Sequence, residues 1–351
     1  MPAPLADPSV RRIAYVRARV GLGDLLCTVP ALRAVRAARP DLWISVVSWA
    51  ETAPVLDRFA AYVDELLPFP GYPGIPERPV DHARVAGFLR SAAARRFDLV
   101  IQGYGDRPAA NEVCERIDAP RTGGFAAAGF APAEPRWYLP YPRDLHEVHR
   151  HLRLVEHLGV AHGADETLEL PVGARERSGF AALARAHGLT PGRYAVVHPG
   201  ATSASRRWPA ERFAAVADGL ARLGLRVAVT GVADEEDITS SVHRQTCGDP
   251  IDLTGRTTLG EFACLLSDAA LLVCNDTGVA HVAAATGTPT VTVFLAGDPA
   301  RWAYPAPHRR VVRAAVACSP CPHLSCPIDF RCAHSLPVGA VMRAARDLLG
   351  P

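Results

Sequence analysis

The segment GLGD, residues 21–24, is the first whose residue types and spacing could do chemistry. Gly21 and Gly23 allow the backbone to turn tightly after a strand, and Asp24 then opens a helix. A carboxylate in that place is either a helix cap or a functional group, and these four residues alone favour neither. The GxGxxG fingerprint of a dinucleotide site is absent because Leu26 occupies its last position, which disfavours NAD binding.

A second segment, HPGATSASRRWP, covers residues 198–209. It offers a turn at Gly200, hydroxyls that include Thr202, guanidiniums that include Arg206, and a helix start at Pro209. Hydroxyls, backbone amides and a bidentate arginine at a helix N-terminus suit a diphosphate. The alternative is an ordinary surface loop.

A third segment, NDTGVAH, covers residues 275–281 between an apolar strand pattern and an apolar helix pattern. Asp276, Thr277 and Gly278 would place a hydroxyl and backbone N–H groups at a helix N-terminus, which is again an anion site. The alternatives are helix capping by Asp276 and Thr277 and, for His281, a hydrogen-bonded histidine of the core.

All 38 basic residues are arginine, because the sequence contains no lysine. This composition excludes a Schiff-base enzyme, a pyridoxal phosphate enzyme and a Walker P-loop. With 36 acidic residues the net charge is only +2, which argues against a nucleic-acid-binding protein held by bulk charge. Any bound phosphate must therefore be held by arginine, hydroxyls, backbone amides or a metal.

Two clusters contain the residue types of metal ligands. Four thiols near the C-terminus could hold a structural zinc or, less favoured, an iron–sulfur cluster, with incidental reduced thiols as the alternative; they are Cys318, Cys321, Cys326 and Cys332. Of the histidines at 146, 149 and 151, the third does not share the face of the first two, so a solvated helix is favoured there. Nine cysteines without an export signal do not indicate a disulfide framework.

The N-terminal region indicates a cytoplasmic protein. It contains no uninterrupted apolar stretch typical of a signal peptide, and nothing in the chain approaches the roughly 18–20 consecutive apolar residues of a membrane span. The arginines of this region favour a solvated helix face, with peripheral contact at the inner face of the membrane as the alternative; they are Arg11, Arg12, Arg17, Arg19, Arg33, Arg36 and Arg39.

Strand and helix patterns alternate along the chain, which predicts an α/β protein with two similar halves and parallel sheets. The first half has predicted strands at 12–16, 43–47 and 99–102 and helices at 25–38, 80–96 and 146–158. The second half has predicted strands at 195–197, 226–230, 271–275 and 290–294 and helices at 209–223, 259–267, 279–286 and 338–349. Proline and glycine predict a loop region at 120–142 and a linker at 161–173.

Five segments in this order make the chain resemble the family 9 glycosyltransferases, the ADP-heptose:lipopolysaccharide heptosyltransferase group. The segments are GLGDLLCTVPALRAVRAARP, HPGATSASRRWPAERFAAVADGL, GVADEED, DLTGRTTLGEFACLL and NDTGVAHVAAATGTPTVTVF. The resemblance covers residues 12–350 and implies the GT-B architecture, two Rossmann-like domains facing a central cleft. Residues 1–172 would bind the acceptor and 173–351 the nucleotide sugar, with the last helix, 338–349, able to pack back on the N-terminal domain.

The resemblance implies an inverting transferase that needs no cofactor. Asp24 would deprotonate the acceptor hydroxyl, which then attacks the anomeric carbon from the face opposite the nucleotide. The family's phosphate-binding hydroxyls fall on Ala201 and Thr202, so the first hydroxyl is lost. Its phosphate-binding lysine falls on Arg206, whose fork can bridge two oxygens. Thr202, Arg206 and the helix start at Gly278 would meet the charge of the leaving group without a metal.

The other donor contacts implied by the resemblance lie in the second half. The family's DTG and the histidine after it, which contact the sugar and the diphosphate, match Asp276, Thr277, Gly278 and His281. The family's ribose-binding acid falls on Glu235 or Glu236, and both remain candidates. The donor is expected to be ADP-heptose, and the acceptor a lipopolysaccharide-core-like glycan or a small molecule.

Two other function classes share part of this pattern. A non-hydrolysing sugar-nucleotide epimerase of GT-B type would keep the diphosphate site but would need no acceptor base on the first helix. A non-catalytic nucleotide-sugar-binding protein would need only the second half of the chain. The presence of both GLGD and NDTG favours the transferase.

Overall fold

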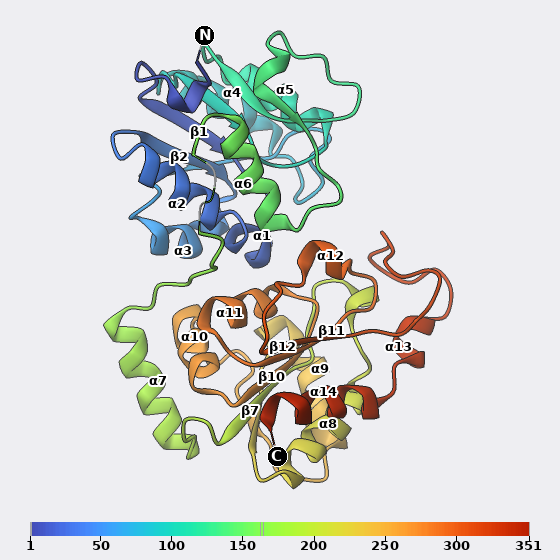
Figure 1. Ribbon diagram of the computed structural model, residues 1–351. Helices are drawn as coiled ribbons and strands as arrows, with labels where there is room; N and C mark the ends of the chain where they lie inside the picture. Colours follow the sequence, from blue (N-terminus) through green and yellow to red (C-terminus); the bar gives the residue numbers. More distant parts are fainter. Residues whose placement is uncertain (1, 162, 164, 351) are drawn as a thin grey trace. The chain divides into compact units, whose positions relative to one another are not determined.

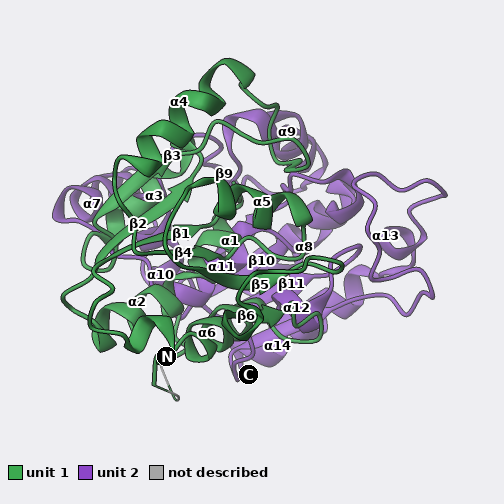
Figure 2. Ribbon diagram, turned by 90° about the horizontal axis from the view of Figure 1, so that it is seen from above, with its two compact units in different colours: residues 1–168 green, residues 169–351 purple. Residues whose placement is uncertain are grey.

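The computed structural model describes residues 2–161, 163 and 165–350. Its contacts define two compact units, Met1–Leu168 and Glu169–Pro351, which Figure 2 shows in different colours. The sequence predicts two domains that meet at 172/173, in the linker 161–173; His162 and Ala164 of that linker lie outside the described residues.

A parallel sheet of six strands forms the centre of unit 1 (Figure 1). The strands are β1 Arg12–Val16, β2 Trp43–Ser48, β3 Glu65–Pro68, β4 Leu99–Gln102, β5 Thr122–Ala126 and β6 Tyr138–Pro140. Their order is β3-β2-β1-β4-β5-β6, which is the doubly wound order of Rossmann-like domains. The order reverses between β1 and β4, so the ligand crevice of such a domain is expected at the carboxyl ends of these two strands.

Helices cover this sheet and bury its apolar residues. The helices of unit 1 are α1 Leu22–Leu26, α2 Val29–Ala38, α3 Ala53–Leu56, α4 His82–Ala93, α5 Pro108–Arg116 and α6 Glu147–His157, with 3-10 turns η1 Pro4–Ala6, η2 Ala50–Thr52, η3 Asp57–Phe59 and η4 Pro135–Trp137. Helix α2 packs on α6, and α5 packs on β4 and β5. One buried cluster joins Val16 of β1 to Phe88 of α4 and Val113 of α5.

Unit 2 repeats the same winding. Its strands are β7 Tyr194–His198, β8 Arg226–Val229, β9 Ile251–Asp252, β10 Leu271–Asn275, β11 Thr290–Val293 and β12 Arg309–Val312, in the order β12-β11-β10-β7-β8-β9. The order reverses between β7 and β10. Its helices are α7 Ala174–His187, α8 Ala210–Arg222, α9 Glu236–Gln245, α10 Leu259–Asp268, α11 Gly278–Thr286, α12 Pro299–Trp302, α13 Arg331–Ser335 and α14 Val338–Leu349, with 3-10 turns η5 Ala204–Arg206 and η6 Ala233–Glu235.

The last helix, α14, is part of unit 2. It packs against α8 and against β10, β11 and β12. Val341 and Ala345 have no exposed surface, and they share a buried cluster with Phe213 of α8. Burial of this apolar face on unit 2 explains the position of the helix.

Two local features differ from the sequence-based expectation. The predicted helix 25–38 is two helices, because Pro30 supplies no N–H donor to continue a turn and instead stands near the start of α2. The predicted loop region 120–142 contains β5 and β6. At Gly124, φ is +133° and a Cβ would lie 2.4 Å from the carbonyl oxygen of Gln102, so only glycine lets this strand approach β4.

Other elements lie outside the sequence-based prediction. They are β3, β9 and β12 and the helices α3, α5, α7, α9, α12 and α13. Helix α7 illustrates the reason, since it buries Phe180 and is otherwise partly or fully exposed. No helix in the described part of the chain is long and apolar enough to cross a membrane.

Candidate functional site

The residues singled out from the sequence follow the strands at which the order of each sheet reverses. In unit 1, GLGD follows β1, and the neighbouring strand β4 leads into residues 103–105. In unit 2, residues 198–209 begin at the end of β7, and NDTG begins at the end of β10. Both groups therefore lie where doubly wound domains bind ligands.

Asp24 is the third residue of α1, not the residue that opens the helix, and its side chain is 21% exposed. Gly21 is the N-cap, with an ordinary φ of −68°, so no left-handed turn is made here. A Cβ on Gly21 would instead lie 2.4 Å from Oδ2 of Asp24. Glycine at position 21 therefore allows the Asp24 carboxylate to lie close to the backbone of the turn. Gly23 is buried within α1.

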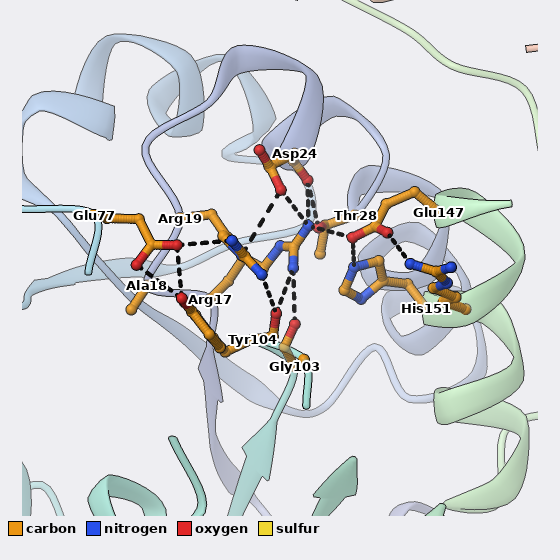
Figure 3. A network of polar contacts seen from close by, with 12 residues as sticks. Arg17, Ala18, Arg19, Asp24, Thr28, Glu77, Gly103, Tyr104, Glu147 and His151 are labelled. Carbon is orange, nitrogen blue, oxygen red and sulfur yellow. Dashed lines mark hydrogen bonds and ion pairs between the residues drawn. The ribbon is translucent and has the colours of Figure 1, made fainter. Parts of the chain in front are cut away.

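Two arginines hold Asp24 (Figure 3). Nη2 of Arg17 donates to the Asp24 carbonyl oxygen at 3.1 Å and lies 3.3 Å from Oδ1. Nε of Arg19 lies 3.9 Å from the same carboxylate oxygen. Arg17 is 1% exposed and Arg19 25%. Sequence reasoning missed both, although an arginine directly after an apolar strand was the available signal.

The N-terminal arginines do not form an unpaired basic surface in the described structure. Six of them have carboxylate partners, and the seventh, Arg12, lies over the ring of Trp43. The pairs are Arg11–Asp41, Arg17–Glu147, Arg19–Glu77, Arg33–Asp165, Arg36–Asp64 and Arg39–Asp41. Five of the paired side chains are at most 25% exposed, so the expectation of a solvated helix face is wrong for them, whereas Arg11 is 62% exposed; the five are Arg17, Arg19, Arg33, Arg36 and Arg39.

The expectation of a solvated helix is also wrong for α6. His146 is its N-cap, and Glu147, Arg150 and His151 are at most 2% exposed. Of the three histidines, His149 is at the surface and forms an ion pair with Glu166 at 2.8 Å. On the buried face of α6, Glu147 instead pairs with Arg17, which contacts Asp24.

In unit 2, Glu235 lies against the turn at Gly200. Its Oε2 accepts a hydrogen bond from the N–H of Val232 at 3.1 Å and lies 3.6 Å from Nε2 of His198. A Cβ on Gly200 would lie 2.2 Å from each carboxylate oxygen of Glu235. Glu236 is exposed at the start of α9. The structure therefore brings Glu235, and not Glu236, to the loop.

His198 was not assigned a role from the sequence, although it opens the second motif. Its Nδ1 lies 3.1 Å from the hydroxyl of Thr230, and its ring lies 6.2 Å from that of Phe262. Burial lowers the pKa of His198 to about 4, so the ring is neutral at pH 7. A neutral imidazole can position Glu235 without adding charge to the site.

Asn275, also missed, joins the second and third motifs. Its Nδ2 donates to the carbonyl oxygen of Pro199 at 2.7 Å, and its Oδ1 accepts from the N–H of Trp208 at 3.1 Å. Because Asn275 is the last residue of β10, these bonds fix the 198–209 loop to the end of the adjacent strand.

Asp276 follows Asn275 and is 4% exposed. Its Oδ2 lies 3.5 Å from Nη1 of Arg206, whose side chain is 38% exposed. Burial raises the pKa of Asp276 to about 6, against the opposing effect of Arg206. A Cβ on Gly297 would lie 1.8 Å from Oδ2 of Asp276, so glycine is required there to admit the carboxylate.

The remaining predicted donor residues lie around the start of α11. Thr277 is its N-cap but makes no side-chain capping hydrogen bond, so capping does not explain this hydroxyl. Gly278 is its first residue, and His281, one turn later, is 4% exposed with its ring 5.9 Å from that of Trp302. Thr202 is exposed on the neighbouring loop.

The C-terminal cysteines, for which a structural zinc was one possibility beside incidental reduced thiols, do not gather into a metal-binding group in the described residues. All four are free thiols, from exposed Cys318 to buried Cys332, and no three His, Cys, Asp or Glu side chains of the described residues form a group that could hold a metal ion. The C-terminal tail that contains these cysteines instead forms hydrogen bonds to the 198–209 loop. The N–H of Ser205 and the hydroxyl of Ser203 each donate to the carbonyl oxygen of Leu324 at 3.0 Å.

The chain has two doubly wound domains, each with polar residues at its switch point, and glycosyltransferases of the GT-B class share this architecture. Comparison with known proteins gives the family. Residues 89–330 match the model of glycosyltransferase family 9 (heptosyltransferase). The chain belongs to this family and is a glycosyltransferase.

Individual relatives agree with this assignment. Lipopolysaccharide heptosyltransferase 3 of Escherichia coli K12 is 25% identical over 80% of this chain and 81% of its own. A second E. coli heptosyltransferase 3 is 33% identical, but the match spans 31% of this chain and only 33% of that relative's length. The family 9 glycosyltransferase structure from Veillonella parvula has a TM-score of 0.79 and 25% identity, covering 97% of both chains. E. coli ADP-heptose heptosyltransferase II shares the fold, with a TM-score of 0.70 and 20% identity over 96% and 98% of the two chains.

Proposed function

We propose that this glycosyltransferase transfers heptose from ADP-heptose to a hydroxyl of a lipopolysaccharide-core-like glycan, with inversion at the anomeric carbon. The observation that carries the proposal is the match to the heptosyltransferase family model over residues 89–330. Donor and acceptor follow the relatives, several of which are lipopolysaccharide heptosyltransferases. A small-molecule acceptor is the alternative, and family membership favours transfer over the epimerase and the non-catalytic binder.

In this proposal the donor binds at the switch point of unit 2. Arg206, Thr202 and the N-terminus of α11 meet the diphosphate, Asp276 and His281 contact the sugar, and Glu235 binds the ribose. Support comes from the 3.5 Å contact between Arg206 and Asp276 and from the position of Glu235 against the Gly200 turn. Charge that develops on the leaving diphosphate is balanced by arginine and backbone N–H groups.

Asp24 of unit 1 is the proposed general base. Its carboxylate takes the proton of the acceptor hydroxyl while that oxygen forms a bond to the anomeric carbon. The bond from the anomeric carbon to the diphosphate breaks, and the nucleoside diphosphate leaves with the electron pair. Partial exposure of the Asp24 side chain, 21%, supports access by an acceptor.

The test is transfer from ADP-heptose to lipopolysaccharide core acceptors, followed by mass spectrometry, with GDP-, UDP- and dTDP-sugars as competitors. Asp24→Asn is expected to lower kcat by at least about 10³-fold and to leave the donor dissociation constant within about twofold, because it removes only the base. Asp57→Asn, which changes an exposed carboxylate of the same unit, is the matched control. Near-normal turnover by Asp24→Asn would remove Asp24 as the base, and epimer formation from donor alone would favour the epimerase.

We further propose that the enzyme works in the cytoplasm at the inner face of the membrane. A lipid-anchored glycan acceptor would be presented there, and this acceptor chemistry is the support for the proposal. The N-terminal arginines lend none, because they are engaged within the fold. Co-sedimentation with vesicles that contain the glycolipid acceptor, compared with vesicles that lack it, tests the contact.

A further inference from the structure

A buried group of charged side chains contacts Asp24 through Arg17 (Figure 3). Arg17, 1% exposed, extends one nitrogen, Nη2, to two carboxylates: Oδ1 of Asp24 at 3.3 Å and Oε1 of Glu147 at 2.9 Å. Its other terminal nitrogen donates to the carbonyl oxygens of Gly103 and Tyr104, at 3.1 and 3.2 Å. The loop after β4 and the first residue of α6 therefore fix the guanidinium that contacts Asp24.

Glu147 is itself held on several sides. Its Oε2 accepts from Nη1 of Arg150 at 3.0 Å, and its Oε1 lies 3.6 Å from Nε2 of His151. Burial lowers the pKa of His151 to about 4, so this ring is neutral at pH 7. The hydroxyl of Tyr15 contacts Nδ1 at 2.7 Å. With Tyr15 as donor, the ring proton is on Nε2 and faces Glu147.

The second arginine near Asp24 repeats this arrangement. Nη1 of Arg19 lies 2.7 Å from Oε1 of Glu77, and its guanidinium lies over the ring of Tyr104 at 4.1 Å. Each guanidinium that contacts Asp24 thus has a carboxylate partner of its own. Arg17 and Arg19 face Asp24 directly. Glu147, Glu77 and Tyr104 face these two arginines, and Arg150 and His151 face Glu147.

Stability does not account for such a network. Buried ion pairs pay a desolvation penalty, and their replacement by apolar residues of similar volume is often neutral or stabilising. A general base has different needs: it must be held in one orientation, and an unopposed arginine beside it would disfavour uptake of a proton. An arginine that already has a carboxylate partner can orient the base, and it weakens the proton affinity of the base less than an unpaired arginine would.

We propose that Arg17 and Glu147 are positioning residues for Asp24, Arg17 by orienting the carboxylate and Glu147 by holding Arg17 and balancing its charge. The proposal rests on the proposed role of Asp24 as general base. It adds two residues, 130 positions apart in the sequence, that touch neither donor nor acceptor.

Glu147→Gln is the first test. Without the Glu147 charge, Arg17 has Asp24 as its remaining carboxylate partner. We expect kcat to fall about 30- to 100-fold, the donor KM to stay within about twofold, and the acid limb of the kcat profile to move to lower pH. Glu65→Gln, which removes the partner of Arg95 at 2.5 Å in the same unit, is the matched control and should change neither kcat nor the limb.

A double variant, Arg17→Met with Glu147→Met, removes both charges of the buried pair. Arg150 loses Glu147 but keeps its hydrogen bonds to the carbonyl oxygens of Pro142 and Arg143 and to the Tyr141 hydroxyl. The double variant should also lower kcat, but it removes the nearest positive charge from Asp24, so the acid limb should move to higher pH. Circular dichroism and thermal melts give the folded fraction, and rates are taken per folded molecule. Unchanged kcat and unchanged limbs in both variants would overturn the proposal and leave a structural role only.

A readout without substrate separates this proposal from the proposed function. Carboxyl ¹³C NMR of the full chain, with the Asp24 signal assigned through Asp24→Asn, follows the titration of this carboxylate directly. The midpoint should move to lower pH in Glu147→Gln and to higher pH in the double variant. If the wild type transfers no heptose, the proposed function fails while this titration still decides the coupling; identical midpoints in all three proteins would overturn it.

Discussion

At the scale of single residues, the proposed donor site contains a carboxylate whose charged form is disfavoured by burial. Asp276 is 4% exposed, and burial raises its pKa from 3.8 to about 6. The contact with Arg206, itself 38% exposed, only partly offsets the desolvation. A carboxylate retained under these conditions is typical of a binding site, where it meets a ligand hydroxyl, and not of a stabilising ion pair.

The raised pKa makes a prediction about stability. The folded state holds the Asp276 proton more tightly than the unfolded chain, so the free energy of unfolding falls as the pH rises from about 4 to about 6. About two pKa units correspond to about 3 kcal/mol. Asp276→Asn should therefore stabilise unit 2 at pH 8 by up to this amount and flatten that pH dependence, while donor affinity falls. Thermal melts across pH 4–8 without donor test it; loss of stability at pH 8 would contradict it.

Arg206 stands where relatives are expected to carry lysine, and its proposed role is to supply positive charge to the donor diphosphate. Arg206→Lys keeps the charge but loses the fork, so donor KM should rise by less than about tenfold. Arg206→Ala should raise donor KM about 10- to 100-fold, the cost of a lost charge-assisted contact. Steady-state kinetics with ADP-heptose measure both. Arg222→Ala, an exposed arginine of the same unit, is the control, and equal KM for Arg206→Ala and wild type would exclude the phosphate role.

At the scale of elements, the proposed donor site depends on one loop that is held on three sides. Residues 198–209 are joined to β10 through Asn275, to the C-terminal tail through Leu324, and to Glu235 at the turn by Gly200. Cysteine residues in the tail suggested a metal from their spacing, but the observed connection is made by serines of the loop and backbone carbonyls of the tail. The loop is therefore shaped by partners distant in the sequence.

Gly200→Ala tests this arrangement. The new Cβ would lie 2.2 Å from the Glu235 carboxylate oxygens, so Glu235 must move. Donor KM should rise about tenfold or more, the cost of one lost hydrogen bond to a charged group, with a smaller change in kcat. Gly248→Ala is the matched control, because its Cβ would have Asp218 no closer than 4.0 Å. Calorimetry measures donor binding in both proteins. Equal donor dissociation constants for Gly200→Ala and wild type would contradict the proposed contact between Glu235 and the ribose.

At the scale of the whole molecule, each unit has its own six-stranded sheet and its own buried cluster. The proposed donor residues all lie in unit 2, and the proposed base lies in unit 1. We predict that residues 169–351 fold alone and are stabilised by ADP-heptose in a thermal melt, whereas residues 1–168 show no shift. Catalysis should require both. Stabilisation of the first fragment but not the second would reverse the assignment of donor and acceptor domains.

Several elements of the fold could be predicted from short stretches of the sequence alone. Apolar runs predicted β1, β4, β10 and α14 within a residue, because a buried strand or an amphipathic helix records its environment in its own side chains. The motifs GLGD and NDTG are contiguous, so their place at strand ends followed directly. The two α/β halves followed from the alternation of these elements.

Tertiary structure decided whatever depends on partners far apart in the chain. Periodicity shows that α14 has an apolar face but not which surface covers it, and it cannot choose between Glu235 and Glu236, which are adjacent. The same limit concealed Arg17 and Glu147, because a buried charge looks like a surface charge until its counter-ion is known. The environment of Asp24 is formed by ion pairs between residues far apart in the sequence, which composition and spacing do not reveal.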